Sequence, residues 1–281
     1  MPELPEVEIT RQHLATALLG RSLVSVSMRH ARTARHNHGS LDIVEQRLTG
    51  RRVLEVRRLG KYLVIPLDDG MTVVAHLGMS GRFSIASPDD PLELHTHFVA
   101  ELDDGTSLRF VDPRTFGFIA VHDDAELETS GIARIGPDAW EDPPAPIDLA
   151  VALRGRTAPI KALLLDQAHI SGLGNIYADE ALFRAGIDPR TPGGEVTDVR
   201  IELLLDAIRE VLGVAISNGG TSLDDLAYLL PDGRAGENLR QLKVYGRDGE
   251  PCYDCGEIID KVVIRSRSTH FCPHCQAPDV G

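Results

Sequence analysis

This 281-residue chain has no long apolar run, few aromatic side chains and no cysteine outside one short segment. No stretch of about 18 consecutive apolar residues occurs, which excludes a transmembrane helix. The N-terminus has no basic region followed by an apolar run, so we expect no secretory signal and a cytoplasmic protein. Aromatic residues make up only 5% of the chain, but hydrophobic residues make up 42%, enough for the core of one large domain or two moderate ones.

Basic charge is also in deficit, because the formal net charge is −13. This argues at first against a nucleic-acid partner, but the distribution of charge matters more than the sum. Residues 1–60 hold ten arginines and six acidic residues, whereas residues 61–233 hold 12 basic and 29 acidic residues. Acidic pairs such as Asp68-Asp69 and Asp103-Asp104 are typical of solvated turns. A bound polyanion would therefore have to meet a local basic surface within an acidic protein.

The spacing of apolar residues changes from helical to alternating after Gly20. Val7, Leu14 and Leu18 form a helical stripe before that glycine. Asp-Gly turns at 68–70 and 103–105 then mark hairpins, so residues 2–125 predict a β-sandwich of seven or eight strands behind a leading helix. The alternating segments are 23–28, 53–56, 62–65, 73–76, 98–100, 108–111 and 118–121.

The second half of the chain predicts helices and a small terminal hairpin, so the fold class is α+β and multidomain. Residues 126–146 are acidic and rich in proline, and we interpret them as a linker. Residues 147–240 form the predicted helical domain, and residues 241–281 form a domain that contains every cysteine. Helices are expected at 149–153, 160–167, 176–185, 198–216 and 223–229.

The cysteines follow the pattern Cys252-x2-Cys255-x16-Cys272-x2-Cys275. Each Cys-x2-Cys pair lets two thiolates bind one ion, and two pairs complete a tetrahedral four-sulfur shell suited to Zn²⁺. The alternative, coincidental free cysteines, is weak because the pattern uses all of them. A closed shell leaves no open position, so we expect one structural zinc ion.

Pro2 would become the N-terminal residue once Met1 is removed, and carboxylates follow at Glu3 and Glu6. An α-amino group has a pKa of about 8, so more of it is free base at neutral pH than of a lysine. A secondary amine can attack an aldehyde carbon and form a cationic iminium, which makes Pro2 a candidate Schiff-base nucleophile. The alternative is an ordinary leader into a helix, with Pro5 at its first position.

A glycine-bearing turn joins two predicted helices ahead of Asn175. Gly172 and Gly174 allow a tight turn, and Asn175 is predicted at the N-cap of the second helix. A helix N-terminus can bind phosphate, although simple capping by Asn175 is the favoured interpretation of this feature taken alone. Lys161, one helix earlier, could serve the same anion or be solvated.

Motifs in order along the chain give a specific resemblance. From Pro2 to about Gln276, the chain resembles the bacterial formamidopyrimidine-DNA glycosylase family (Fpg, or MutM). The motifs are Pro2-Glu3-Leu4-Pro5-Glu6-Val7-Glu8, Gly60-Lys61-Tyr62-Leu63, His76-Leu77-Gly78-Met79-Ser80-Gly81, Asp112-Pro113-Arg114-Thr115-Phe116-Gly117, Gly174-Asn175-Ile176-Tyr177 and the terminal zinc finger.

The resemblance implies a β-sandwich, a helix–two-turn–helix domain and a zinc finger. It also implies a bifunctional enzyme of base excision repair that removes 8-oxoguanine and formamidopyrimidines from duplex DNA and cuts the strand by β,δ-elimination. The expected partner is damaged duplex DNA and not a membrane, and we expect a monomer associated with a bacterial nucleoid in the cytoplasm.

The resemblance assigns roles to individual residues. Pro2 resembles the nucleophile that attacks C1′ of the damaged nucleotide. Glu3 resembles the general acid/base, and Glu6 resembles a support for the start of the helix. Lys61 and Arg267 resemble phosphate-binding members of the catalytic set.

Further residues resemble DNA contacts of the family. Asn175 and Lys161 correspond to phosphate contacts, and His76 and His95 correspond to DNA-contacting histidines, although a lone histidine is more often structural. Three others correspond to the trio that fills the gap left by a flipped base: Met79, Arg114 and Phe116. A base must leave the stack to be cut, and an apolar wedge with a guanidinium can occupy its place. Core packing is the alternative for Met79 and Phe116.

Two features bear on specificity. Thr115 stands where the family often has a basic residue, and residues 219–223 fit the lesion-recognition region, followed by a loop at 228–239 rich in helix breakers. An endonuclease VIII-like enzyme for oxidised pyrimidines is the nearest alternative, but Leu4 and the Arg114/Phe116 pair favour the Fpg branch. A zinc-finger DNA-binding protein without catalysis is the other alternative. Intact Pro2, with Glu3 and Lys61, argues against it.

Overall fold

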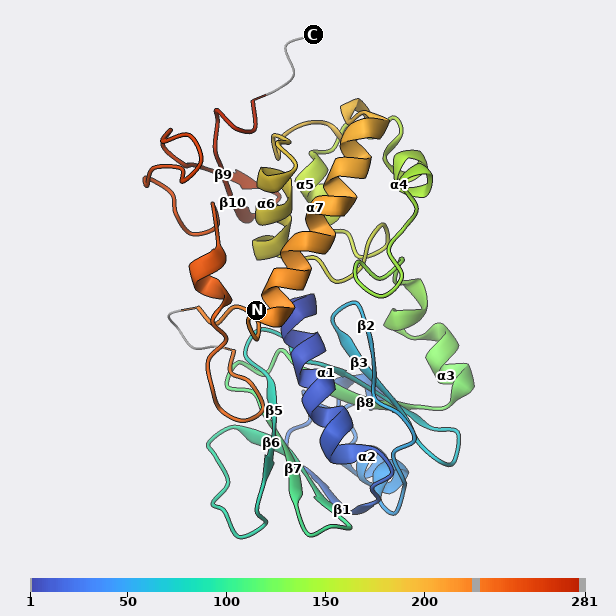
Figure 1. Ribbon diagram of the computed structural model, residues 1–281. Helices are drawn as coiled ribbons and strands as arrows, with labels where there is room; N and C mark the ends of the chain where they lie inside the picture. The colour runs from blue at the N-terminus through green and yellow to red at the C-terminus, as the bar shows by residue number, and fades with distance from the viewer. Residues whose placement is uncertain (1, 224–227, 278–281) are drawn as a thin grey trace. The chain divides into compact units, whose positions relative to one another are not determined.

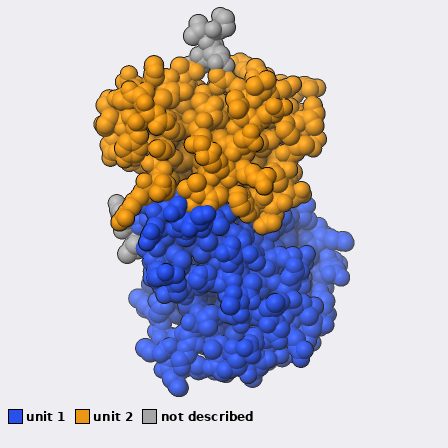
Figure 2. Space-filling view, in the orientation of Figure 1, with its two compact units in different colours: residues 1–134, 216–239 blue, residues 135–215, 240–281 orange. Residues whose placement is uncertain are grey.

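The computed structural model describes residues 2–223 and 228–277, which fall into two compact units (Figure 2). The first unit combines residues 1–134 with 216–239, and the second combines residues 135–215 with 240–281. Each unit is therefore built from two separate stretches of sequence.

The strands of the first unit pair antiparallel into two four-stranded sheets, which confirms the predicted β-sandwich (Figure 1). The strand order is β1-β6-β7-β5 in one sheet and β2-β3-β4-β8 in the other. The first sheet consists of β1 (Leu23–Met28), β5 (Arg82–Ala86), β6 (Thr96–Leu102) and β7 (Ser107–Val111). The second consists of β2 (Arg57–Leu59), β3 (Tyr62–Pro66), β4 (Thr72–His76) and β8 (Phe118–His122).

The leading helix α1 (Leu4–Leu18) shares one core with both sheets. Its predicted stripe is buried, with Val7, Leu14 and Leu18 at most 1% exposed. Burying a side chain of this kind contributes about 1.5–3 kcal/mol, so packing holds α1 firmly against the sandwich. The start of the helix therefore has a defined place within this unit.

The predicted strand at 53–56 is wrong. The residues that pair with β3 across the tight turn after Leu59 are 57–59, whereas Val53 makes only an isolated bridge to Leu67. The predicted hairpin turns at 68–70 and 103–105 are confirmed, since they join β3 to β4 and β6 to β7.

Several short elements of the first unit were not predicted. They include β2 and β5, and also α2 (Leu41–Leu48), α3 (Asp124–Thr129), η1 (Arg35–Asn37) and η2 (Gly131–Arg134). α2 buries only Val44 and Leu48, too short a stripe to stand out in the sequence. α3 and η2 overlap the stretch 126–146 that we interpreted as a linker.

Helices and one hairpin form the second unit, as expected. The helices are α4 (Pro146–Leu153), α5 (Ile160–Leu164), α6 (Asn175–Arg184) and α7 (Asp198–Ser217), with the short turn η3 (Gly193–Glu195). The last two residues of α7 and the first two of the turn η4 (Asn238–Gln241) are counted with the first unit. The hairpin pairs β9 (Asp260–Ile264) with β10 (Arg267–Phe271). Four residues of the helix predicted at 223–229 lie outside the described residues, and the other three are not helical. Among the described residues, no helix is long and apolar enough to cross a membrane.

Candidate active site

Two carboxylates hold the start of α1 by contacts with the backbone. Glu3 is the N-cap residue, and its amide donates to Oε2 of Glu6 at 2.8 Å. Oε1 of Glu6 accepts a second backbone bond, from the amide of Thr221 at 2.7 Å. Glu3 and Glu6 are at most 2% exposed. Glu6 therefore supports the helix start, as expected, and fixes the backbone of Glu3 directly after Pro2.

Thr221 lies in the stretch 219–223 that fits the lesion-recognition region. Gly220 beside it has a φ of +80°, and a Cβ there would come within 2.9 Å of Oε1 of Glu6. Glycine is thus required both by the backbone and by the close carboxylate. Burial and the charge of Glu6 raise the pKa of Tyr228, which packs against Ile9, so its phenol stays protonated.

Lys61 occupies the two-residue turn between β2 and β3, after Gly60 with a φ of +57°. Arg58 donates from Nη1 to the carbonyl of Gly60 at 3.0 Å. Its Nε donates to Oε2 of Glu8, on α1, at 3.1 Å. The side chains of Arg58 and Glu8 are 1% and 4% exposed. This buried ion pair ties the lysine turn to the helix that Glu3 caps.

His76, at the end of β4, is held as a neutral imidazole. Burial, and then the positive charge of Lys61, lower its pKa to about 4. The amide of Gly78 donates to Nδ1 of the ring at 2.9 Å. Because that nitrogen accepts, the neutral ring carries its proton on Nε2. The same bond shapes the turn that bears Met79, which is partly exposed.

Asp112 organises the loop that carries Arg114 and Phe116. It is fully buried, and its carboxylate accepts hydrogen bonds from the Ser80 hydroxyl and the Gly117 amide, both at 2.7 Å. The loop also lies against the turn of Met79, since a Cβ on Gly78 would meet the Gly117 nitrogen at 2.4 Å. The structure thus brings the turn of Met79 and the Arg114/Phe116 loop together.

Phe116 is an exposed aromatic ring flanked by cations. It is 41% exposed, and the guanidinium carbons of Arg114 and Arg32 lie 5.3 and 5.4 Å from its ring centroid. Arg35 donates to the carbonyl of Phe116 at 2.8 Å. An exposed ring on a braced backbone can enter a base stack, whereas a core ring cannot. This geometry favours the functional interpretation of Phe116 over core packing.

His95 is exposed and lies beside the same loop. It has a φ of +66°, which is uncommon for a residue other than glycine. Its carbonyl accepts from the amide of Asp112 at 3.1 Å. Nε2 of the buried His97 lies 2.9 Å from the carbonyl of Asp112. His97 is therefore the histidine whose ring braces this loop, and no motif in the sequence indicates it.

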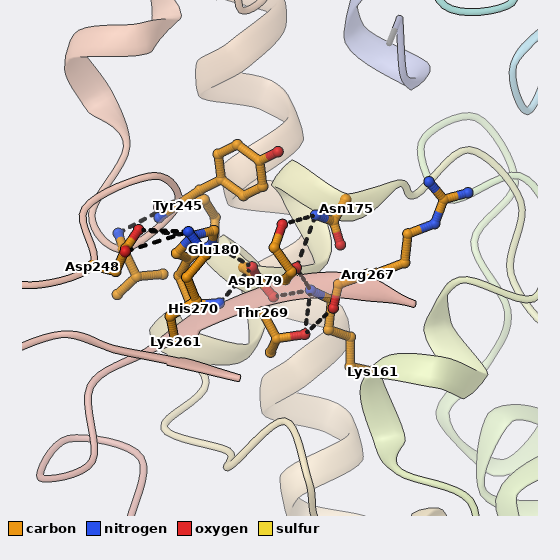
Figure 3. Close-up of polar contacts among 12 residues, drawn as sticks. Lys161, Asn175, Asp179, Glu180, Tyr245, Asp248, Lys261, Arg267, Thr269 and His270 are labelled. Carbon is orange, nitrogen blue, oxygen red and sulfur yellow. Dashed lines mark hydrogen bonds and ion pairs between the residues drawn. The ribbon is translucent and has the colours of Figure 1, made fainter. Parts of the chain in front are cut away.

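The other predicted DNA contacts, Lys161, Asn175 and Arg267, lie in the second unit. Figure 3 shows their side chains. α6 starts at Asn175 with Gly174 as its N-cap, so the predicted capping role of Asn175 is wrong. Its side-chain nitrogen instead donates to the carbonyl of Ser268 at 2.9 Å. Lys161 donates to the same carbonyl at 2.8 Å and is fully buried. Arg267, the residue before Ser268, is exposed.

The four cysteines converge on one point, as their spacing predicts. Their sulfur atoms all lie within 4.8 Å of one another. The Cys252 and Cys275 sulfurs are 4.0 Å apart, and those of Cys255 and Cys272 are 3.5 Å apart. Zn–S bonds of about 2.3 Å in a tetrahedron separate sulfurs by roughly 3.8 Å. The site therefore fits one structural Zn²⁺ bound by four thiolates.

Comparison with known proteins agrees with this architecture. The formamidopyrimidine-DNA glycosylase N-terminal domain matches residues 1–119, the H2TH domain of the same glycosylase matches residues 135–226, and a zinc finger found in FPG and IleRS matches residues 249–278. The fold and the order of these domains define a zinc-finger DNA glycosylase of the helix–two-turn–helix class.

Full-length relatives narrow the assignment. The formamidopyrimidine-DNA glycosylase of Rhizorhabdus wittichii is 45% identical over 98% of this chain and all of its own. MutM (Fpg) of Thermus thermophilus is 40% identical with a TM-score of 0.86, covering 98% of each chain. A Lactococcus lactis FPG mutant, solved with Fapy-dG-containing DNA, is 33% identical with a TM-score of 0.90, covering 99% of this chain and 100% of its own. The chain belongs to the formamidopyrimidine-DNA glycosylase (Fpg/MutM) family.

Proposed function

We propose that the protein is a bifunctional DNA glycosylase and AP lyase that removes oxidised purines, 8-oxoguanine and formamidopyrimidines, from duplex DNA in base excision repair. The start of α1 carries the proposal. Pro2 directly precedes the N-cap residue Glu3, and the carboxylate of Glu6 is occupied by the amides of Glu3 and Thr221. The Glu3 side chain accepts from the Glu6 amide in the capping box, and it is the carboxyl group adjacent in sequence to the Pro2 amine, so we assign the proton transfer to it.

The proposed reaction begins when the free amine of Pro2 attacks C1′ of the damaged nucleotide. The bond from C1′ to the base nitrogen breaks, and the base leaves with that electron pair and takes up a proton. Glu3 protonates the ring oxygen O4′ as the sugar opens, and C1′ becomes an iminium on the Pro2 nitrogen. Loss of protons from C2′ and then C4′ expels the 3′ and 5′ phosphates. Hydrolysis of the iminium releases the sugar remnant and restores the amine.

Chemistry at C1′ requires the damaged base to leave the stack. We assign the vacated space to Met79, Arg114 and Phe116. The support is the exposure of Phe116 between two guanidiniums and the packing of its loop against the turn of Met79. Arg114 would pair with the cytosine left without a partner.

Lys61, Asn175 and Arg267 are the proposed phosphate contacts flanking the lesion, with Lys61 and Arg267 closest to the reaction. His76 contributes as a neutral Nε2–H donor, since its Nδ1 accepts from Gly78. His95 is the second histidine contact proposed. The protein would act as a monomer on the nucleoid of a bacterial cytoplasm.

Borohydride trapping tests the proposed chemistry. Incubation with 8-oxoguanine duplex and borohydride should reduce the iminium and cross-link the DNA to the N-terminal peptide. Pro2→Gly protein with Met1 removed is the variant that probes the nucleophile, and the parent with unmodified duplex is the control. Equal cross-linking and cutting by Pro2→Gly would contradict the role of Pro2.

An endonuclease VIII-like preference for oxidised pyrimidines is the second candidate. The observation that favours it is Thr115, which stands where the family often has a basic residue. Thr115 lies in the loop that carries Arg114 and Phe116, and this loop would face the opposite strand. Parallel cleavage assays on 8-oxoguanine and thymine glycol duplexes separate the two activities. Binding without cutting either substrate would instead identify a catalytically inactive zinc-finger DNA-binding protein.

A further inference from the structure

Lys161 and Asp179 form a completely buried ion pair in the second unit (Figure 3). The Lys161 ammonium lies 2.6 Å from Oδ1 of Asp179, and both side chains are 0% exposed. Lys161 comes from α5 and Asp179 from α6. A buried ion pair seldom adds net stability over apolar residues of similar volume, so its retention calls for a reason other than stability.

The pair is bonded to three consecutive residues of β10. Nζ of Lys161 donates to the carbonyl of Ser268 at 2.8 Å and to the hydroxyl of Thr269 at 2.9 Å. Oδ2 of Asp179 accepts from the amide of His270 at 2.9 Å. The two charged side chains therefore hydrogen-bond to the backbone of the strand on both sides of Thr269.

Arg267 is the first residue of this strand and follows an unusual turn. Arg265 and Ser266, which connect β9 to β10, have φ values of +45° and +63°. Neither is glycine, so this turn carries a local conformational cost. The Thr269 hydroxyl that receives the Lys161 bond itself donates to the carbonyl of Arg267 at 3.2 Å. A hydrogen-bonded chain thus runs from Asp179 through Lys161 and Thr269 to the backbone of Arg267.

We propose that Lys161 and Asp179 are positioning residues that set the backbone of Arg267, and that Lys161 does not itself touch DNA. The inference rests on the proposed phosphate contact of Arg267. An ammonium with no exposed surface, within 3 Å of a carboxylate, a carbonyl and a hydroxyl, has its three protons directed into the protein. Asn175 donates directly to the same Ser268 carbonyl at 2.9 Å, so its own contact with β10 does not run through Lys161.

A double-mutant cycle between Lys161 and Arg267 tests the proposal. The probe is a duplex with a tetrahydrofuran abasic-site analogue, which cannot be cleaved, so that dissociation constants are measured without catalysis. We expect Lys161→Met to raise Kd about tenfold in the parent and less than about twofold when Arg267→Ala is already present. Lys261→Met is the matched control, because it removes one exposed lysine from the same hairpin and should change Kd less than about twofold.

Salt dependence separates positioning from contact. A direct phosphate contact by Lys161 would lower the slope of log K against log salt by about 0.9 in both backgrounds. The positioning role predicts no change of slope when Lys161→Met is made on Arg267→Ala. Equal losses of affinity in the two backgrounds, or no loss in the parent, would overturn the proposal.

Zinc content and a volume-conserving pair of substitutions guard against simple misfolding. Lys161→Met with Asp179→Leu replaces the pair by apolar residues and should keep one zinc per chain while weakening binding as Lys161→Met does. Loss of zinc in this double variant would show a general structural role and refute the specific one. The cycle measures binding and does not depend on cleavage. If the protein failed to cut an 8-oxoguanine substrate, the proposed activity would be contradicted, but the cycle would still test the role of Lys161.

Discussion

Arg58 and Glu8 form a buried ion pair that joins the turn of Lys61 to α1, with 3.1 Å between Nε and Oε2. The pair is asymmetric, because Glu8 also accepts from Arg11 and Gln12. Burial alone would raise the pKa of Glu8, but the hydrogen bonds from Arg11 and Gln12, together with the charges of Arg11 and Arg58, outweigh it and lower that pKa. Glu8 is therefore held as a carboxylate by three neighbouring side chains.

We predict that Arg58→Met lowers the free energy of unfolding by about 2–3 kcal/mol, because the Gly60 carbonyl and one side of Glu8 lose a buried partner. Glu8→Gln should lower the free energy of unfolding by more, because the buried Arg58 guanidinium then loses its carboxylate. Arg57→Met is the neighbouring control: its ion pair with Glu55 is 56% exposed on both sides and contributes less than about 1 kcal/mol. Urea unfolding measures all three. Equal effects of Arg57→Met and Arg58→Met would contradict the pairing.

Retention of Met1 should abolish strand cutting while leaving binding to damaged duplex within about threefold of the parent. The reason is that the Pro2 nitrogen becomes an amide, which has no nucleophilic lone pair. Mass spectrometry of the N-terminus, beside a cleavage gel, measures the two quantities on one preparation. Cutting by protein that fully retains Met1 would count directly against Pro2 as the nucleophile.

Acid should destabilise the sandwich through His76. The pKa of its ring is about 4 in the folded chain, against about 6.5 when unfolded, so the unfolded state binds more protons between these values. Stability is therefore full above pH 6.5 and falls as the pH drops towards 4, by up to about 3 kcal/mol. His76→Asn, whose carbonyl can accept from the Gly78 amide without titrating, should flatten the curve. An unchanged pH dependence in that variant would assign the loss to other groups.

Phe116→Ala should reduce cleavage of 8-oxoguanine duplex at least about fivefold, because a stacked aromatic ring contributes about 1–3 kcal/mol per base. The free energy of unfolding should change by less than about 0.5 kcal/mol, since the ring is 41% exposed. Leu94→Ala, at an 81% exposed position, is the control and should leave both quantities unchanged. A large loss of stability in Phe116→Ala would return the residue to a packing role.

Removal of zinc should abolish binding through the terminal hairpin. Cys255→Ser or treatment with a strong chelator leaves three or fewer thiolate ligands, and the segment from Cys252 to Cys275 then loses the constraint that fixes it. We expect DNA affinity to fall to about the level of Arg267→Ala. Metal analysis and titration of the thiols measure zinc directly, and unchanged affinity at zero zinc would exclude this role.

The sequence predicts best what short motifs encode. The four cysteines, the helical stripe of α1 and the alternating strands other than 53–56 follow from local spacing, and the structure confirms them. The elements that were missed, β2, β5 and α2, are short and owe their form to partners far along the chain.

Contacts between distant residues explain the rest. Asp112 lies in a recognisable motif and Arg58 flanks another. Their burial could be known only from the fold, and so could their partners, Ser80 for Asp112 and Glu8 for Arg58. Lys161 illustrates the converse. Its isolation in the sequence suggested an anion contact, whereas its surroundings are the carboxylate of Asp179 and the backbone of β10.

The bond from Thr221 to Glu6 has a consequence for the order of folding during synthesis. It spans 215 residues of sequence, so the helix that Glu3 caps receives this last amide only after the whole intervening chain has left the ribosome. The sandwich can form from residues up to 134, because its sheets and core are complete by then. A nascent or truncated chain would thus hold a folded scaffold with an unfinished proposed reaction centre, and the backbone of Glu3 beside the Pro2 amine would be set in place only as synthesis nears its end.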